Sequence, residues 1–578
     1  MRTILKELKQ YKTATILTPL FMALEVVMEV LLPFVTAMII DQGLQQGKMA
    51  AVWRYGAIMI VMAFFSLLFG ALSGIFATRA SSGLAANLRL AMYRKIQTFS
   101  FSNIDKFSTA GLVTRMTTDV TNVQNAFQMM IRIAVRAPLV ILISMVMSFV
   151  INVEMGMIFL VAVVFLAIIV VLLMKRTSGI FQTVFQKYDA LNETVQENIN
   201  GIRVVKSFVR EDYENQKFGK AVGILYKLFV KAEGLIALNN PVMMLVIYAC
   251  IISVSWFGAH YIVSGTMTTG NLTSLFSYIM SIMMSLMMLS MVFVMITMSF
   301  ASIRRISQVL NEVPDLHNAE TTLTVVSDGS IDFNHVHFSY GTDSQEETLQ
   351  DIDLHIHSGE TIGIIGGTGS GKSSLVNLIS RLYDVTSGAV LVGGRNVKEY
   401  DMDALREQVS VVLQKNVLFT GTILSNLRWG NPDATEEECM EVCRQAAADE
   451  FIERLPDGLH TPVERGGANF SGGQKQRLCI ARALLKKPKV LILDDSTSAV
   501  DTATDARIRQ SFRTKIPGTT KLIIAQRISS VQDADRILVL DEGRINGFDT
   551  HENLLKTNEI YREIFESQQE AGGDFDLA

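Results

Sequence analysis

Six long apolar stretches in the first half of the chain constrain its fold more than any other feature. Crossing the hydrocarbon core of a bilayer as a helix takes about 20 mostly apolar residues, and each stretch is close to that length. The stretches occupy residues 14–40, 57–77, 137–153, 157–174, 242–264 and 274–300. The first is too long for a signal peptide, contains acidic residues and has no small-residue cleavage site after it. The pattern therefore predicts a helical membrane domain.

The second half of the chain has a different composition. Only 19% of the 578 residues are charged, against about 25% in soluble proteins. Through residue 320 there are 26 basic and 17 acidic residues, and after it 26 basic and 39 acidic residues. A basic, apolar first half and an acidic second half predict a membrane domain followed by a soluble one. No basic arm interleaved with aromatic residues occurs, so nucleic-acid binding is not expected.

The positive charges predict the orientation of the spans. The segment 79–136 contains eight Lys or Arg residues and the segment 175–235 contains ten, whereas only Lys48 and Arg54 lie between the first two spans. Because Lys and Arg collect in cytoplasmic loops, both long segments and both termini are expected on the cytoplasmic side of a multi-pass cell membrane protein. At 50–60 residues these segments are too long for bare connections. They are interpreted as helices that continue the spans inward, with a small globular insert as the alternative.

For two groups of side chains within the spans, the sequence allows either a ligand-binding role or a structural role. Glu25 and Glu29 lie one helical turn apart, and a carboxylate at bilayer depth is costly unless it faces the protein interior or water. They either contact a cationic substrate or have a structural partner, such as hydroxyls or an Arg of a neighbouring helix. Methionines recur every three or four residues in the last span, which suits either adaptable ligand contacts or plain helix packing. These methionines are Met280, Met284, Met287, Met291, Met295 and Met298.

A phosphate-binding loop is the strongest motif of the second half. The apolar strand 361–365 runs directly into a glycine-rich loop, Lys372, Ser373 and an apolar helix, which is the context that this motif requires. The glycines let backbone N–H groups surround phosphate oxygens, Lys372 supplies charge to the β and γ phosphates, and the Ser373 hydroxyl can ligate Mg²⁺. The predicted nucleotide-binding residues here are Gly366, Gly367, Thr368, Gly369, Ser370, Gly371, Lys372, Ser373 and Ser374.

Two further segments complete the predicted site. A second apolar strand, 490–493, ends in Asp494, which suits the carboxylate on the Mg²⁺ side of a P-loop site. Residues 470–474 (Phe-Ser-Gly-Gly-Gln) open a helix, and the start of a helix can bind an anion. Because the P-loop already binds the chain's own nucleotide, this second anion site suggests a nucleotide presented by another subunit. Cys439 and Cys443 lie one turn apart without a nearby His or second Cys pair, so helix packing is expected rather than metal binding.

The motif at residues 470–474 resembles the signature of ATP-binding cassettes. Together with the P-loop and six spans, it makes the whole chain similar to a half-transporter of the ABC exporter superfamily. The resemblance implies a six-span α-helical transmembrane domain over 1–320 and an α/β P-loop nucleotide-binding domain over 321–567. Residues 568–578 are expected from their sequence to form a flexible tail. The resemblance also implies ATP and Mg²⁺ as cofactors, membrane lipid as surroundings, and a second half-transporter as partner.

The same resemblance assigns further residues. Tyr340 would stack on adenine, Gln414 would lie between Mg²⁺ and the transmembrane helices, and residues 498–501 would form the D-loop that ends in Asp501. Short coupling helices would lie near Thr109–Asn122 and Arg210–Phe218. The implied signature residues are Phe470, Ser471, Gly472, Gly473 and Gln474. The implied Mg²⁺ ligands are Ser373, Gln414 and Asp494.

Two residues depart from the family pattern. Asp495 occupies the position of the usual Glu general base, and Gln526 that of the usual switch His. Withdrawing a carboxylate by about 1 Å can cost on the order of 10²-fold in rate, so a site that binds ATP and hydrolyses it slowly is expected. The pattern is similar to one chain of the heterodimeric bacterial multidrug exporters of the LmrCD, BmrCD and EfrCD type.

That similarity implies a translocase subunit, with hydrolysis mainly at the partner's site and hydrophobic or amphipathic drugs as cargo. Export of a lipid or peptide, a non-transporting ATP-binding regulator, and a homodimer with two slow sites are the alternatives.

Overall fold

The computed structural model describes residues 2–340, 347–495 and 500–573. It divides into two compact units, each described here by itself. The helical unit contains Met1–Gln97 and Thr109–Glu312, and the α/β unit contains Thr98–Ser108 and Val313–Ala578. The α/β unit therefore begins a few residues before the predicted boundary at 320, and it takes a short segment from the first long loop.

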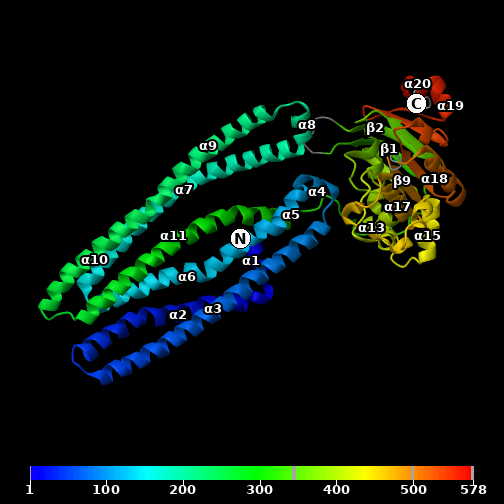
Figure 1. The fold of residues 1–578 in the computed structure, drawn as a ribbon. Coiled ribbons are helices and arrows are strands. Elements are labelled where there is room, and N and C mark those ends of the chain that lie inside the picture. The colour runs from blue at the N-terminus through cyan, green and yellow to red at the C-terminus, as the bar shows by residue number, and fades with distance from the viewer. Residues whose placement is uncertain (1, 341–346, 496–499, 574–578) are drawn as a thin grey trace. The chain divides into compact units, whose positions relative to one another are not determined.

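The helical unit consists of long helices joined by tight turns (Figure 1). Six of the helical segments that the structure describes are long and apolar enough to cross a membrane, which confirms the six predicted spans. They are Lys9–Leu44, Met49–Gln97, Thr109–Ile151, Val153–Phe181, Glu211–Val263 and Thr269–Phe293. The helices of this unit are α1 (Arg2–Lys6), α2 (Lys12–Met38), α3 (Met49–Gln97), α5 (Thr109–Thr114), α6 (Val120–Ile151), α7 (Val153–Asn200), α8 (Ile202–Ser207), α9 (Glu211–Ala237), α10 (Asn239–Val263) and α11 (Thr269–Asn311).

The long loops are helical, as predicted, and contain no globular insert among the described residues. Helix α3 has 49 residues and α7 has 48, so each extends about 70 Å at 1.5 Å per residue. The turns at the loop tips differ from the prediction. The tip helix of the second loop is α8, which follows Gly201, whereas Arg210–Phe218 begins α9. In the first loop the separate short helix is α4 (Phe101–Phe107), which begins after the N-cap Ser100.

The core of the helical unit lies where α2, α6, α7, α10 and α11 meet. Helix α2 packs along α3, α6 along α11, and α7 along α9 (Figure 1). Met22 and Val26 of α2 are four residues apart and fully buried, as are Leu275 and Tyr278 of α11 at a spacing of three. Such spacing places each pair on one face of its helix, which explains why these faces form the core.

Two large sheets organise the α/β unit. The six-stranded sheet has the order β12-β11-β3-β10-β9-β6, and its strands are parallel except for β12 at one edge. The antiparallel four-stranded sheet has the order β2-β1-β4-β5. The strands are β1 (Ile331–Phe338), β2 (Leu349–Ile356), β3 (Thr361–Gly366), β4 (Ser387–Val392), β5 (Arg395–Asn396), β6 (Val409–Val412), β7 (Gly421–Thr422), β8 (Pro462–Val463), β9 (Val490–Asp494), β10 (Thr520–Ile524), β11 (Arg536–Asp541) and β12 (Arg544–Asp549).

Helices cover the six-stranded sheet, so its central strands are buried. Every residue of β9 and β10 is buried, which explains their continuous apolar runs. The helices of this unit are α4, α12 (Lys372–Ile379), α13 (Met402–Gln408), α14 (Ile423–Leu427), α15 (Glu436–Gln445), α16 (Asp449–Ile452), α17 (Gly472–Leu484), α18 (Thr502–Lys515), α19 (His551–Thr557) and α20 (Glu559–Gly573). Helix α20 continues through the first six residues of the segment expected to be a flexible tail.

Candidate functional site

The glycine-rich loop lies between β3 and α12, at the carboxyl end of a buried parallel strand. Gly369 and Gly371 have φ angles of 87° and 94°, which side chains with a Cβ rarely adopt. Gly366 lies so close to Leu540 of β11 that a Cβ at Gly366 would be 2.1 Å from the Leu540 carbonyl oxygen. The loop therefore needs glycine for its shape, and it leads into the N-terminus of α12, where backbone N–H groups are free to bind an anion.

Lys372 folds back over this loop. Its Nζ donates to the carbonyl oxygens of Gly366 at 2.8 Å and Gly367 at 2.6 Å. Burial lowers the pKa of Lys372, and the nearby carboxylates of Asp494 and Asp495 oppose that shift. A cation in this place can interact with phosphate oxygens that are bound in the loop.

The predicted Mg²⁺ ligands are only partly brought together. The Ser373 hydroxyl donates to Asp494 Oδ1 at 3.0 Å, and burial raises the pKa of the Asp494 carboxyl group. Oxygen ligands at this spacing fit Mg²⁺, which prefers one or two carboxylates plus nucleotide oxygens. Gln414 follows β6, the strand next to β9, and its side chain is exposed.

Asp495 and Gln526 are direct partners. Asp495 follows β9 and Gln526 follows β10, and because these strands are parallel neighbours in register, their carboxyl ends meet. Gln526 Nε2 donates to Asp495 Oδ2 at 2.7 Å. Asp495 has a φ of 49°, a left-handed conformation that Asp tolerates better than most residues. Both side chains line a cavity of about 110 Å³, which also contains Asp505 and Arg527.

A residue near the C-terminus supports this pair. The side-chain amide of Gln568 accepts a hydrogen bond from the Ile528 N–H and donates one to the Gln526 carbonyl oxygen, both at 2.8 Å. Helix α20 thus fixes the backbone on either side of Arg527. The sequence analysis missed this contact because it treated residue 568 as the start of the tail. The apolar residues Ile560, Ile564 and Phe565, which pack on the core, are the signal that predicts a helix there.

The signature motif starts α17. Ser471 is the N-cap, its Oγ accepts from the Gln474 N–H at 3.3 Å, and the Gln474 side chain accepts from the Ser471 N–H at 2.9 Å. Phe470 is buried, whereas Ser471, Gly472 and Asn469 are exposed. This capping box fixes the helix start and leaves the serine–glycine turn accessible to an anion from outside the chain.

The D-loop lies partly outside the described residues. Ser498 and Ala499 are not described, and Asp501 is the N-cap of α18, where its side chain accepts from the Thr504 N–H at 2.9 Å. Cys439 and Cys443 are buried in the core of the α/β unit, and burial raises the pKa of the Cys443 thiol. In the described part of the chain, no group of three or more His, Cys, Asp or Glu residues is placed to bind a metal.

Tyr340 belongs to an aromatic cluster. Its hydroxyl is 2.8 Å from Ser374 Oγ, and its half-exposed ring meets the ring of Tyr383 edge-on at 5.1 Å. Tyr383 in turn donates to Asp105 Oδ2 of α4 at 2.8 Å. Burial, reinforced by Asp105, raises the pKa of Tyr383. Tyr340, the expected adenine-stacking residue, is therefore linked to α4 through Tyr383.

In the spans, the structure identifies a partner for the two acidic residues. Arg136 of α6 forms ion pairs with Glu25 at 2.6 Å and Glu29 at 2.5 Å. Gly70 of α3 faces the same place, since a Cβ there would lie 3.1 Å from the Glu25 carboxyl carbon. The structural partner that the sequence left open is thus an Arg of a neighbouring helix.

The methionines of α11 do not share one environment. Met280, Met284 and Met291 are at least half exposed, whereas Met287 packs partly against the core. The side chain of Met298 lies outside the described residues.

These features define a class: a multi-span membrane protein whose α/β unit contains a P-loop and a second, exposed serine–glycine turn at the start of α17. Comparison with known proteins agrees. The ABC transporter transmembrane region model matches residues 15–287, and the ABC transporter model matches residues 349–498. The chain belongs to the ABC transporter family.

Several relatives are similar over nearly the whole chain. An uncharacterized ABC transporter ATP-binding protein of Bacillus subtilis, YfiB, is 36% identical over 98% of both chains. A similarly described protein of Mycobacterium tuberculosis is 37% identical over 93% of both chains. The solved structure of a bacterial Atm1-family ABC exporter with ATP bound matches with a TM-score of 0.81, covers 97% of this chain and 98% of its own, and is 24% identical. The fold is therefore that of an ABC exporter.

Proposed function

We propose that this chain is one half of a heterodimeric ATP-driven exporter and that its own ATP site hydrolyses slowly. The observation that carries the proposal is the pairing of Asp495 with Gln526 beside an intact P-loop. An uncharged amide donates to the carboxylate that follows Asp494, in the place where a general base must accept a proton from water.

Binding and hydrolysis make different demands on the site. For binding, the loop N–H groups and Lys372 would hold the phosphates, Ser373 and Asp494 would hold Mg²⁺, and Tyr340 would stack on the adenine. For hydrolysis, a carboxylate must reach the attacking water. Asp495 is one methylene shorter than Glu, so its reach is reduced, and its Oδ2 already accepts a hydrogen bond from Gln526 at 2.7 Å.

The exposed signature turn supports a dimer. Ser471 and Gly472 are accessible at the start of a 13-residue helix, so they can cover a nucleotide bound to another chain. Since this turn is intact and the catalytic pair is not, the partner is expected to have Glu and His at the positions equivalent to Asp495 and Gln526. A weakened signature in the partner would leave this chain's own site incomplete. Self-pairing would instead give two slow sites.

The charge distribution supports placement in a bacterial cell membrane with both termini in the cytoplasm. The ends of the helices that extend beyond the spans are basic, and the turn at Asn152, where α6 meets α7, contains no basic residue. Lys and Arg accumulate on the cytoplasmic side of membrane proteins. The α/β unit, which follows α11, would lie on that side with the ATP supply.

The proposed cargo is a hydrophobic or amphipathic small molecule. The test is ATP-dependent accumulation of a fluorescent amphipathic dye in inverted membrane vesicles that contain the chain and its partner. Accumulation that is lost in Lys372→Ala of this chain supports the proposal. If the vesicles bind ATP but never accumulate dye, lipid or peptide, a regulatory role replaces export.

A further inference from the structure

A polar seam, formed by side chains of residues 115–122 and 302–308, joins the start of α6 to α11. At its centre Asp119 is fully buried. Its Oδ2 accepts from Arg305 Nε at 2.7 Å, and its Oδ1 accepts from Ser302 Oγ at 2.8 Å. A second guanidinium nitrogen of Arg305 donates to Oδ1, which makes the ion pair bidentate. Because a carboxylate removed from water is costly unless it is paired and hydrogen-bonded, the buried position of Asp119 depends on α11.

The contacts on either side of this ion pair continue the seam. Arg115 donates to the Arg305 carbonyl oxygen at 3.0 Å and to Gln308 Oε1 at 3.3 Å. Asn122 Nδ2 donates to Ser302 Oγ at 3.3 Å. Ser302, Arg305 and Gln308 are three residues apart, and such residues lie on one face of a helix. Helix α11 therefore presents one polar edge to the segment that enters α6.

The residues of the seam on the α6 side begin in an unusual turn. Arg115–Asp119 is a π-helical turn between α5 and α6, in which hydrogen bonds span five residues instead of four. Such turns are rare and occur mostly at functional sites. Its first and last residues, Arg115 and Asp119, both contact α11, so the turn directs two charged side chains to the same helix.

The seam also joins two of the connections between the helical unit and the α/β unit. The chain returns to the helical unit at Thr109, ten residues before Asp119, and it leaves that unit after Glu312, seven residues beyond Arg305. Without the seam, these connections would enter two separately mobile helices. With it, they enter helices that a buried ion pair holds together.

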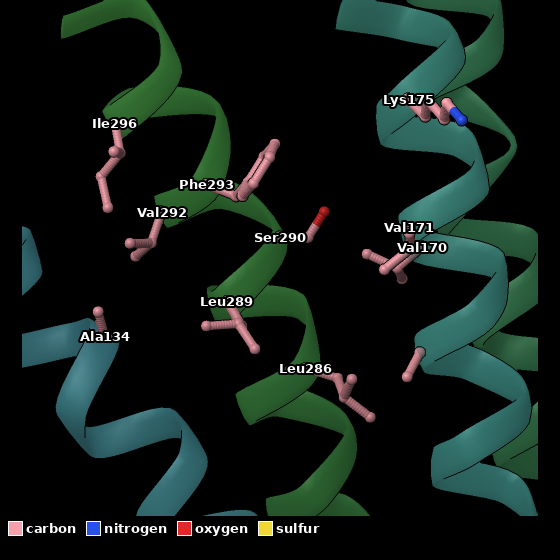
Figure 2. A pocket seen from close by; sticks show the side chains of 11 residues that line it. Ala134, Val170, Val171, Lys175, Leu286, Leu289, Ser290, Val292, Phe293 and Ile296 are labelled. Atoms are coloured by element: carbon pink, nitrogen blue, oxygen red, sulfur yellow. The ribbon is translucent and has the colours of Figure 1, made fainter. Parts of the chain in front are cut away.

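The packing of α11 is looser toward α7 than toward α6. Helix α11 packs along α6, whereas a mostly apolar cavity of about 600 Å³ is lined by residues of α6, α7 and α11. Figure 2 shows Leu286 of α11 and Val170 of α7 facing each other across this space. Side chains that line an empty volume lose contacts with atoms on its far side. A displacement of α11 is therefore shared more readily with α6 than with α7.

We infer that Asp119 and Arg305 are positioning residues that make α6 and α11 move as one body. An ATP-driven displacement of the α/β unit would then reach both helices together. Replacing a buried ion pair with apolar residues is often neutral for stability, and the best-attested use of such polar groups is to fix one arrangement of helices. The pair holds this role whether the partner subunit is a second copy or a different chain, because the role requires only the ABC exporter fold.

The test is pulsed electron paramagnetic resonance on the complete transporter in nanodiscs, without nucleotide and with ATP, Mg²⁺ and vanadate. The four native cysteines are buried, so spin labels attach to exposed cysteines that are introduced in pairs. Asn125→Cys with Ala301→Cys reports the separation of α6 and α11. Lys48→Cys with Glu154→Cys reports the α2–α3 turn relative to the α6–α7 turn. In the unmodified background, the first distance should stay constant and the second should change with ATP.

Two variants remove the ion pair. Asp119→Asn and Arg305→Gln are each expected to broaden the first distance distribution and to lower the ATP-shifted fraction of the second about threefold or more, since members of one buried network couple by this order. Bound ATP should stay within about twofold, because neither residue belongs to the nucleotide site. The double variant should be no worse than either single variant, because the two residues act as a unit. Arg304→Gln, which changes the exposed neighbouring cation, is the matched control.

A milder variant keeps the test readable if the charge variants fail to fold. Ser302→Ala removes one hydrogen bond to Asp119 and no charge, and it should still broaden the distance between α6 and α11. Three results would each overturn the inference: an ATP-dependent first distance in the unmodified background, no ATP-dependent second distance there, or an unchanged ATP response in every variant that folds. Because vanadate-trapped or ATP-bound states suffice, a slow ATP site does not affect the reading.

Discussion

Replacing Asp495 with Glu tests whether the reach of the carboxylate limits hydrolysis. The added C–C bond of about 1.5 Å moves the carboxylate past its present position, where it lies 2.7 Å from Gln526 Nε2. The adjoining cavity of about 110 Å³ has room for one more methylene. Restoring an offset of about 1 Å is worth on the order of 10²-fold in rate, or about 2.7 kcal/mol of activation free energy.

The assay is steady-state phosphate release by the purified full-length chain in nanodiscs at saturating ATP and Mg²⁺. A self-paired chain still offers an intact signature to each site, so Asp495→Glu should raise kcat by 10- to 100-fold with little change in KM. Asp495→Asn is the control and should stay at the level of the unmodified chain. If Asp495→Glu stays within about twofold, and Asp495→Glu with Gln526→His does as well, the reach and switch explanation is refuted.

Three further predictions follow from contacts that the structure adds. In the Asp495→Glu background, Gln568→Ala should lower kcat several-fold at constant KM, because it removes the two hydrogen bonds that hold the backbone at Gln526 and Ile528. Gln569→Ala is the matched control, and equal effects of the two substitutions would refute the role of Gln568. Tyr383→Phe keeps the ring but loses the bond to Asp105, so ATP affinity should stay within about twofold while substrate-stimulated turnover of the complete transporter falls about threefold; a matching loss of ATP affinity would contradict this. Arg136→Gln should lower the thermal unfolding midpoint, through a loss of about 2 kcal/mol from stranding two partly buried carboxylates, and Glu25→Gln with Glu29→Gln in that variant should restore it; unchanged melting would argue against the ion pairs.

The features that depend on local sequence could be predicted. Hydropathy over about 20 residues identifies a span wherever the span packs, and the glycines of residues 366–371 encode the loop through their own backbone freedom. The parallel strands β3 and β9 were recognisable because burial on both faces requires continuous apolar runs. The short helices α4 and α8 at the loop tips lie several residues before the predicted coupling helices. They begin after single residues, Ser100 and Gly201, which leave only a weak signal in the hydrophobic pattern.

Contacts between distant residues could not be predicted in the same way. Arg136 was counted only as a basic loop residue, and its position on α6 opposite Glu25 follows from how α2 and α6 pack. Tyr383 and Asp105 are 278 residues apart, and no periodicity links them. Gln568 reaches the loop that contains Gln526 only because α20 packs on the core of the α/β unit. A single sequence gives the side chains of such a site, and the tertiary packing gives their partners.

The central claim is that this chain binds ATP well and hydrolyses it slowly at its own site, so that rapid turnover requires the competent site of a different partner. The most direct measurement is the ATP turnover of the chain purified alone, with bound nucleotide quantified in the same sample. Enzymes typically turn over about 10 times per second, and the account predicts a value at least about 100-fold lower with near-stoichiometric ATP bound. Turnover of about 10 s⁻¹ by the chain paired only with itself would contradict it.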